Sequence, residues 1–139
     1  RLDISGFVLS GGNDIGDIEK RDATERVLLN YAAAKSLPVL GICRGMQFMT
    51  VWSGGSNKLV QGHVNTNHRV SGHINEIVNS FHSFAADICP KDYQITAKSD
   101  DGLIEAFKHC YLPWEGIMWH PERYEHFNKS DIDRVNKLF

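Results

Sequence analysis

Cys43 stands between two glycines in the stretch GICRGMQ, directly after a run of aliphatic residues. A structural cysteine needs only an apolar pocket, and a flanking glycine weakens the strand or helix that contains it. If a strand ending at Ile42 turns sharply into a helix, Gly41 and Gly45 allow neighbouring backbone to pass close to a strained residue. This is the arrangement of a nucleophile elbow, with cysteine in place of serine.

The chemistry of such a cysteine follows from its position. Its thiol would project at the carboxyl edge of a sheet, where open α/β folds bind ligands. The N-terminal end of the following helix would lower the pKa of the thiol, and its free N–H groups would hold developing negative charge. A buried small residue in a glycine-rich turn remains the alternative interpretation of this motif.

A second motif, WHPER, spans residues 119–123. His120 and Glu122 are two residues apart, so in an extended segment their side chains leave on the same side, and Pro121 restrains the backbone between them. A carboxylate beside an imidazole fixes the tautomer and leaves the other ring nitrogen to face a thiol. Alone, this turn is more often a surface feature; together with the cysteine elbow it predicts a catalytic pair.

A third motif is SGGND, which follows the first strand-like run. Gly11 and Gly12 offer backbone N–H groups to an oxyanion, and the N–H of Arg44, just after the cysteine, complements them. Because glycine pairs are common in turns, this interpretation depends on the other two motifs.

The elements that position these motifs alternate along the chain. Residues 4–12 read as a buried strand and loop, and residues 22–35 as a helix with a capping box from Asp22 to Glu25. Residues 37–43 read as a strand covered on both faces, and residues 46–53 as a second helix. We expect the first helix to bury one face, formed by Val27, Leu28, Tyr31 and Ala32. This order predicts a parallel α/β unit with right-handed crossovers.

The second half of the chain has weaker signals. Residues 58–79 are polar and rich in histidine, which predicts short strands or loops. Residues 92–109 alternate on either side of a turn at residues 99–102, which predicts a hairpin. A strand at residues 115–120 and a final helix at residues 130–139 follow, the helix with Ile132, Val135 and Leu138 facing inward.

The composition predicts one ordinary globular domain of 139 residues, with 42% hydrophobic and 23% charged residues. A formal charge of −2 gives no basic field for nucleic acid or an anionic membrane, and no stretch approaches a membrane span or a signal peptide. We therefore expect a cytoplasmic protein. Three cysteines without tight spacing predict free thiols. Because the chain starts with Arg1 and enters a strand almost at once, we expect an N-terminal strand or segment to be missing.

The motifs GICRGMQ, WHPE, SGG and NSFH, taken together and in this family's order, resemble the class I glutamine amidotransferase family, and most closely its stand-alone γ-glutamyl hydrolase branch. The resemblance implies a flavodoxin-like three-layer α/β sandwich around a mainly parallel central sheet. It implies Cys43 as nucleophile, His120 as general base and acid, and Glu122 as the residue that orients His120. The other implied site residues are Gly12 and Arg44 as oxyanion donors, and Gly11, Gln47, Asn79, Ser80, Phe81 and His82 around the glutamyl group.

The implied reaction is hydrolysis of a γ-glutamyl amide through a thioester, with no metal or organic cofactor. RGMQ resembles hydrolases that act on small-molecule γ-glutamyl conjugates, such as γ-glutamyl-aminobutyrate or the CDP-linked amidates of surface-polysaccharide pathways. Lys58, His63, His68 and Arg69 are then expected to meet the phosphates. One departure concerns the substrate segment: many relatives continue NS-x-H with His-Gln, where this chain has Ser83 and Phe84.

Two alternatives remain open. The chain could be a glutaminase subunit that delivers ammonia to a synthase, and the expected protein partner is such a synthase or a second copy of this chain. It could instead be a metal-binding module that uses His63, His68, His73 and His82, although their spacings of five, five and nine match no zinc pattern.

Overall fold

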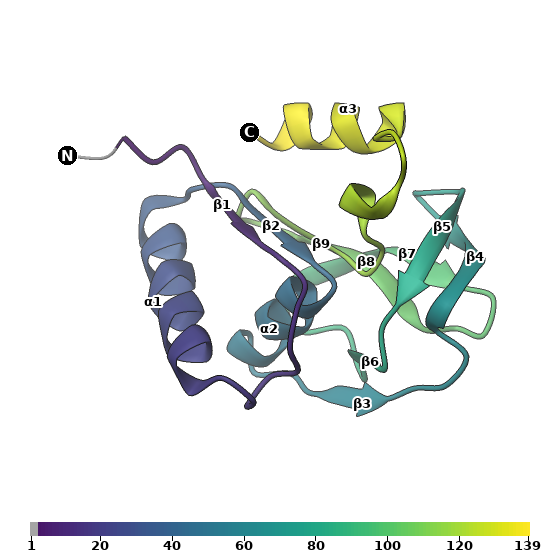
Figure 1. The fold of residues 1–139 in the computed structure, drawn as a ribbon. Helices are drawn as coiled ribbons and strands as arrows, with labels where there is room; N and C mark the ends of the chain where they lie inside the picture. Colours follow the sequence, from purple (N-terminus) through teal and green to yellow (C-terminus); the bar gives the residue numbers. More distant parts are fainter. Residues whose placement is uncertain (1–2) are drawn as a thin grey trace.

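The computed structural model describes residues 3–139 and has three layers (Figure 1). Helices α1 and α2 cover one face of a central sheet, and α3 lies on the other. The elements are β1 (Phe7–Leu9), α1 (Glu19–Lys35), β2 (Val39–Ile42), α2 (Arg44–Trp52), β3 (Asn57–Leu59), β4 (Val64–Gly72), β5 (Glu76–Phe81), β6 (Phe84–Ala86), β7 (Tyr93–Ser99), β8 (Ile104–His109), β9 (Trp114–Ile117), the short 3₁₀ helix η1 (Pro121–Arg123) and α3 (Lys129–Leu138). The three-layer α/β architecture confirms the predicted fold class.

The central sheet has seven strands in the order β1-β2-β9-β8-β7-β4-β5, and it is mixed. Strands β1, β2 and β9 are parallel, whereas β8, β7, β4 and β5 continue the sheet with antiparallel pairings. Strands β3 and β6 form a separate two-stranded sheet near α2. The parallel part of the sheet therefore coincides with the strands that precede Cys43 and His120.

Apolar residues of β2 face both layers, which explains their unalternating pattern. Val39 packs into the core under α1 and α2 together with Leu29 and Met46. Leu40 packs into the core on the other face, together with Trp119. A strand with both faces buried reads as a continuous aliphatic run, as expected for a parallel sheet.

The predicted capping box of α1 is wrong, and the predicted buried face is wrong in part. The helix starts at Glu19, three residues before Asp22, and Val27 and Tyr31 are exposed. Ala32 is buried as predicted, and the other buried positions are Glu25 and Leu29. The physical reason is a charged contact: Asp22 and Glu25 form ion pairs with Arg44 on α2, which turns this polar face inward.

The inward face predicted for α3 is also wrong in part. Ile132 and Val135 are exposed, while Leu138 packs against the core. Asp131 is buried in their place because it accepts a hydrogen bond from the indole N–H of Trp119 at 3.1 Å. The predicted hairpin is confirmed as β7 and β8, and the polar region 58–79 contains longer strands than expected. Among residues 3–139, no helix combines the length and apolar character needed to cross a membrane.

Candidate active site

Cys43 sits at a sharp turn between β2 and α2, with φ 51° and ψ −104°. Positive φ is strained for a side chain other than glycine, and such strain concentrates at functional sites. Gly45 is required because a side chain there would collide with the carbonyl oxygen of Leu9. A Cβ at Gly41 would lie 2.7 Å from the backbone nitrogen of Met46. The elbow geometry expected from GICRGMQ is therefore present.

His120 follows the neighbouring parallel strand and lies at the same sheet edge as Cys43. Ile42 pairs with Ile117 in register, and the backbone N–H of Cys43 donates to the carbonyl of Ile117 at 2.7 Å. Cys43 thus follows the end of β2 at the level where the neighbouring strand β9 ends. His120 lies three residues after the end of β9. Carboxyl ends of parallel strands are where open α/β folds place reacting groups.

The imidazole of His120 is oriented by Glu122. Its Nδ1 lies 2.6 Å from Oε1 of Glu122, and the ring is buried. Because a carboxylate accepts, Nδ1 carries the proton in this contact and Nε2 offers a lone pair. That Nε2 is buried without a hydrogen-bond partner among the described residues 3–139. Such a nitrogen is positioned to take a proton from a nearby acidic group.

The predicted substrate segment Asn79–His82 makes contacts within the protein. The side chain of Asn79 bonds the backbone of His120, and the ring of Phe81 meets the His120 ring edge-on at 5.9 Å. The hydroxyl of Ser80 donates to the carbonyl of His63 at 2.8 Å, and His82 faces Glu105. Asn79 and Phe81 therefore support His120, whereas Ser80 and His82 contact other residues. A direct contact of this segment with the glutamyl group stays a prediction.

The expected lowering of the Cys43 pKa is wrong. Burial raises the pKa of the thiol to about 11, and the hydrogen bond from the backbone N–H of Arg44 and the charge of Arg123 lower it by less. The N-terminal end of α2 thus contributes in the predicted direction, but desolvation dominates. The resting side chain is a neutral thiol that needs a base to become a nucleophile.

The SGG loop lies against the catalytic histidine candidate. A Cβ at Gly11 would come within 2.5 Å of the His120 ring, and Gly12 has φ 144°, which favours glycine. The guanidinium of Arg21 donates to the carbonyls of Ser10 and Gly11 at 2.9 and 3.0 Å. Because these carbonyls are occupied, the orientation of the loop's peptide groups is fixed.

The backbone and the side chain of Arg44 make separate contacts. Its backbone N–H contacts the Cys43 thiol, while its fully buried side chain pairs with Asp22 and Glu25 of α1. Glu25 also accepts from Arg21 at 3.1 Å. This network of charges connects the elbow, helix α1 and the SGG loop, and no pattern in the sequence predicted it.

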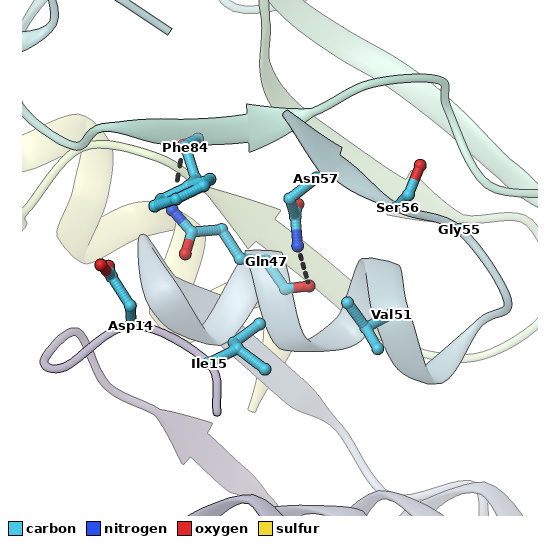
Figure 2. Close-up of a pocket in the computed structure, with 8 residues that line it drawn as sticks. All are labelled: Asp14, Ile15, Gln47, Val51, Gly55, Ser56, Asn57 and Phe84. Carbon is cyan, nitrogen blue, oxygen red and sulfur yellow. Dashed lines mark hydrogen bonds between the residues drawn. The ribbon is translucent and has the colours of Figure 1, made fainter. Parts of the chain in front are cut away.

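A pocket runs along α2 from Gln47 to the segment that follows the helix (Figure 2). The Gln47 amide donates to the carbonyl of Phe84 at 3.0 Å, and Asn57 donates to the Gln47 backbone carbonyl at 3.1 Å. Figure 2 shows the carboxamide oxygen of Gln47 on the side of Asp14, an exposed carboxylate that no sequence motif singled out. The lining residues are Asp14, Ile15, Gln47, Val51, Gly55, Ser56, Asn57 and Phe84.

The structure also gathers His63, His68 and His82 around the buried carboxylate of Glu105. His73, the fourth histidine considered from the sequence, is exposed and outside this group. Glu105 was missed because it stands in an ordinary strand pattern. His63 and His68, two of the residues predicted to contact phosphates, direct ring nitrogens toward Glu105. Nζ of Lys58, a third such residue, lies 3.5 Å from Oδ1 of Asp87.

Comparison with known proteins identifies relatives of several activities. The γ-glutamyl-CDP-amidate hydrolase of Campylobacter jejuni is 33% identical over 135 residues, which cover 93% of this chain and 68% of that protein. The γ-glutamyl-γ-aminobutyrate hydrolase of Escherichia coli is 28% identical over 151 residues, covering 86% of this chain and 58% of that protein. Component 2 of the anthranilate synthase of Methanocaldococcus jannaschii is 37% identical over 97 residues, covering 62% of this chain and 49% of that protein.

Solved structures share the fold. A glutamine amidotransferase from Thermotoga maritima superposes with a TM-score of 0.73 at 18% identity, covering 99% of this chain and 65% of that one. The sequence profile of the family "Glutamine amidotransferase class-I" matches residues 1–133. The chain therefore belongs to the class I glutamine amidotransferase family.

Proposed function

We propose that this protein hydrolyses a γ-glutamyl amide, with Cys43 as nucleophile and His120 and Glu122 as its partners. The observation that carries the proposal is the positive φ of Cys43 at the carboxyl end of β2. A thiol on a strained elbow, at the same sheet edge as a carboxylate-bound imidazole, has the parts that nucleophilic acyl transfer needs.

Acylation uses the free nitrogen of His120. As the Cys43 sulfur attacks the γ-carbonyl carbon, its proton passes to Nε2 of His120, and the carbonyl oxygen becomes an oxyanion. The backbone N–H groups of Arg44 and Gly12 stabilise that charge. His120 then gives the proton to the departing nitrogen, the carbon–nitrogen bond breaks, and an amine or ammonia leaves behind a γ-glutamyl thioester.

Deacylation reverses these roles. His120 takes a proton from water, the oxygen attacks the thioester carbon, and the carbon–sulfur bond breaks. The proton returns to the Cys43 sulfur, and glutamate is released. Glu122 keeps the Nδ1 proton on His120 throughout and stabilises the imidazolium that forms in both steps. These steps draw only on groups of this chain and on water.

The pocket beside Gln47 suits the amino-acid end of the glutamyl group. The exposed carboxylate of Asp14 and the carboxamide oxygen of Gln47 are both acceptors, as an α-ammonium requires. Arg123 is close enough to influence the thiol electrostatically and is exposed. The positive charge of Arg123 favours a substrate whose leaving group is anionic. Both the CDP-linked amidates and γ-glutamyl-γ-aminobutyrate have an anionic leaving part, so it is the similarity to the C. jejuni hydrolase that favours a CDP-linked amidate.

The alternative is a glutaminase subunit that supplies ammonia to a synthase. It is favoured by similarity to the small chain of the carbamoyl phosphate synthase of Clostridium perfringens and to component 2 of an anthranilate synthase. The chain covers only 36% and 49% of these two proteins, so their partners are not transferred to it.

The test is glutamate release from glutamine, γ-glutamyl-CDP-amidate and γ-glutamyl-γ-aminobutyrate. We expect the CDP conjugate to have the highest kcat/KM and Cys43→Ala to abolish its turnover. Cys110→Ala, which changes an exposed thiol, is the matched control and should keep full activity. Turnover that persists in Cys43→Ala would refute the nucleophile. Glutamine as the best substrate, with activity stimulated by an added synthase, would establish the alternative.

A further inference from the structure

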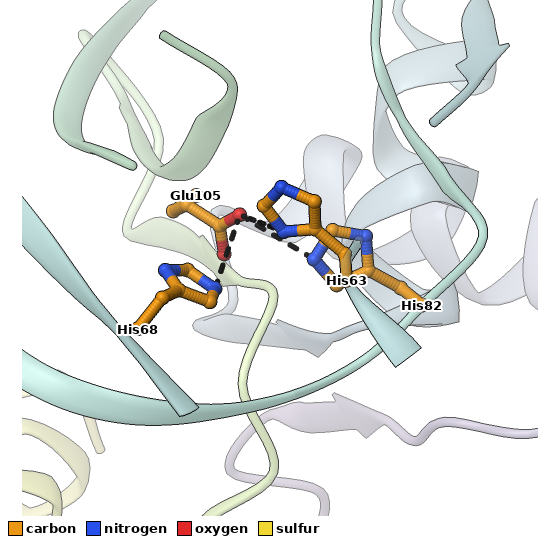
Figure 3. A group of neighbouring side chains, drawn as sticks. All are labelled: His63, His68, His82 and Glu105. Carbon is orange, nitrogen blue, oxygen red and sulfur yellow. Dashed lines mark ion pairs between the residues drawn. The ribbon is translucent and has the colours of Figure 1, made fainter. Parts of the chain in front are cut away.

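Three imidazole rings surround one carboxylate in the interior beside β8 (Figure 3). Nδ1 of His63 and Nε2 of His82 each lie 3.4 Å from Oε1 of Glu105, and Nε2 of His68 lies 3.7 Å from it. Glu105 is fully buried, and His63 and His82 are nearly so. One ligand atom from each of the four residues lies within 4.8 Å of the other three.

In each ring, the outward nitrogen, which points away from Glu105, already has a hydrogen-bond acceptor. Nε2 of His63 lies 2.8 Å from the Asp101 carboxylate. Nδ1 of His82 lies 3.0 Å from the carbonyl of Phe84, and Nδ1 of His68 lies 3.2 Å from the carbonyl of Arg69. Because these partners only accept, the outward nitrogens carry the protons, and a neutral ring then presents a bare lone pair to the cluster. Metal-binding histidines have this second contact almost without exception.

Most of the ring nitrogens and carboxylate oxygens that face the centre of the cluster have no hydrogen-bond partner in the described part of the chain. Both carboxylate oxygens of Glu105, Nε2 of His68 and Nε2 of His82 are buried without a hydrogen-bond partner there. A buried carboxylate facing lone pairs is strongly unfavourable without a cation between them. A direct bond from an imidazolium to a carboxylate would bring nitrogen and oxygen to about 2.8 Å, shorter than the distances here.

The three distances from the rings to Glu105 fit a metal ion instead. Ligand bonds of about 2.1 Å around tetrahedral zinc separate neighbouring ligand atoms by about 3.4 Å. We propose that His63, His68, His82 and Glu105 form a binding site for a divalent transition metal of the zinc class. The set of three imidazoles and one carboxylate suits zinc, and four protein ligands make a closed, structural site rather than a catalytic one.

The site has an access route from the surface. His68 is only partly buried, and the opening beside it is lined by Gly62, His63, Thr66, His68, Ser99 and Asp101, together with Asp100. A bound ion would join residues of β4 and β8, which are not neighbours in the sheet, with the segments that flank β4 and β5. We therefore expect the metal to stabilise the fold, independently of the function proposed for Cys43.

The experiment uses the Cys43→Ala protein, so that zinc cannot bind a Cys43–His120 pair. Chelator-treated protein is titrated with zinc chloride alone, and bound metal and melting temperature are measured. We expect about one zinc per chain and, at a hundredfold excess over Kd, a rise in Tm of about 10 °C. Asp101→Asn should weaken zinc binding about tenfold or more, because it removes the carboxylate behind His63.

Matched variants separate the site from other histidines. Glu105→Gln keeps the volume and should abolish the zinc-dependent rise in Tm, while its metal-free form should be at least as stable as the parent because the buried charge is gone. His73→Asn changes an exposed histidine outside the cluster and should leave the titration unchanged. The proposal is overturned if the Cys43→Ala parent takes up no zinc, or if Glu105→Gln shows the same rise in Tm.

Discussion

The side chain of Asn79 holds the backbone of His120 from both directions. Its Oδ1 accepts from the His120 N–H, and its Nδ2 donates to the His120 carbonyl, each at 2.8 Å. Asn79 belongs to β5 at the far edge of the sheet, so this pair of bonds fixes the segment after β9 to a distant strand. The position of the imidazole therefore depends on a residue 41 positions away in the sequence.

Replacing Asn79 tests this positioning. Asn79→Ala removes both bonds, and we expect kcat to fall roughly 10²-fold with a smaller change in KM, because a displaced base slows chemistry more than binding. Asn67→Ala, on an exposed position of β4, is the control. A change confined to KM would indicate that Asn79 contacts the substrate and does not act through His120.

Glu122→Gln tests the orientation of the His120 ring. The amide keeps the size of the carboxylate but stabilises the imidazolium far less, so kcat should fall about 10²-fold or more. Steady-state kinetics with the preferred γ-glutamyl substrate measures the effect. Glu125→Gln, an exposed glutamate three residues further on, should leave kcat unchanged. Equal rates for the two variants would contradict the role of Glu122.

The raised pKa of Cys43 predicts how the free enzyme reacts with iodoacetamide. With a pKa of about 11, the alkylation rate at residue 43 should be low at neutral pH and rise as the pH increases toward 11. Peptide mapping after alkylation gives the rate at each pH. A high, constant rate between about pH 6 and 8 would instead reveal a thiolate–imidazolium pair.

The same pKa also affects stability. An unfolded thiol, with its ordinary pKa of 9.0, loses its proton before the folded one does. The contribution of Cys43 to the free energy of unfolding is therefore complete below about pH 9 and declines as the pH rises toward 11. Cys43→Ala should remove this part of the alkaline decline, which urea unfolding at a series of pH values would measure.

Glu25→Gln tests the buried charge network of α1. Arg44 would keep only Asp22 as a charged partner, so we expect a loss of about 3 kcal/mol in the free energy of unfolding, measured in urea. Activity should also fall, because Glu25 holds Arg21, which bonds the SGG loop. Glu19→Gln, on the exposed first turn of α1, is the control. Unchanged stability in Glu25→Gln would mean that Asp22 alone neutralises Arg44.

The sequence predicted the elements that carry local signals. The elbow around Cys43, the parallel β1-α1-β2 unit and the hairpin of β7 and β8 follow from glycine placement, aliphatic runs and alternation. The apposition of His120 and Glu122 follows from their spacing and the intervening proline. These features depend on residues close together in the chain, which is why patterns reveal them.

Features that depend on distant contacts were missed. The polar face of α1 is buried only because Arg44 lies opposite it, and Asp131 replaces Ile132 in the interior because Trp119 donates to it. Glu105 looks like any strand residue until the fold brings three histidines to it. The pKa of Cys43 likewise depends on how deeply the elbow is buried, which no local pattern gives.

The central claim is that Cys43 forms a γ-glutamyl thioester, and trapping with hydroxylamine tests it most directly. During turnover of a γ-glutamyl substrate, hydroxylamine should compete with water for the acyl group and produce γ-glutamyl hydroxamate in proportion to its concentration. Cys43→Ala should form none, and Cys110→Ala should match the wild type. Glutamate release without hydroxamate at any hydroxylamine concentration, or turnover retained in Cys43→Ala, would contradict the account.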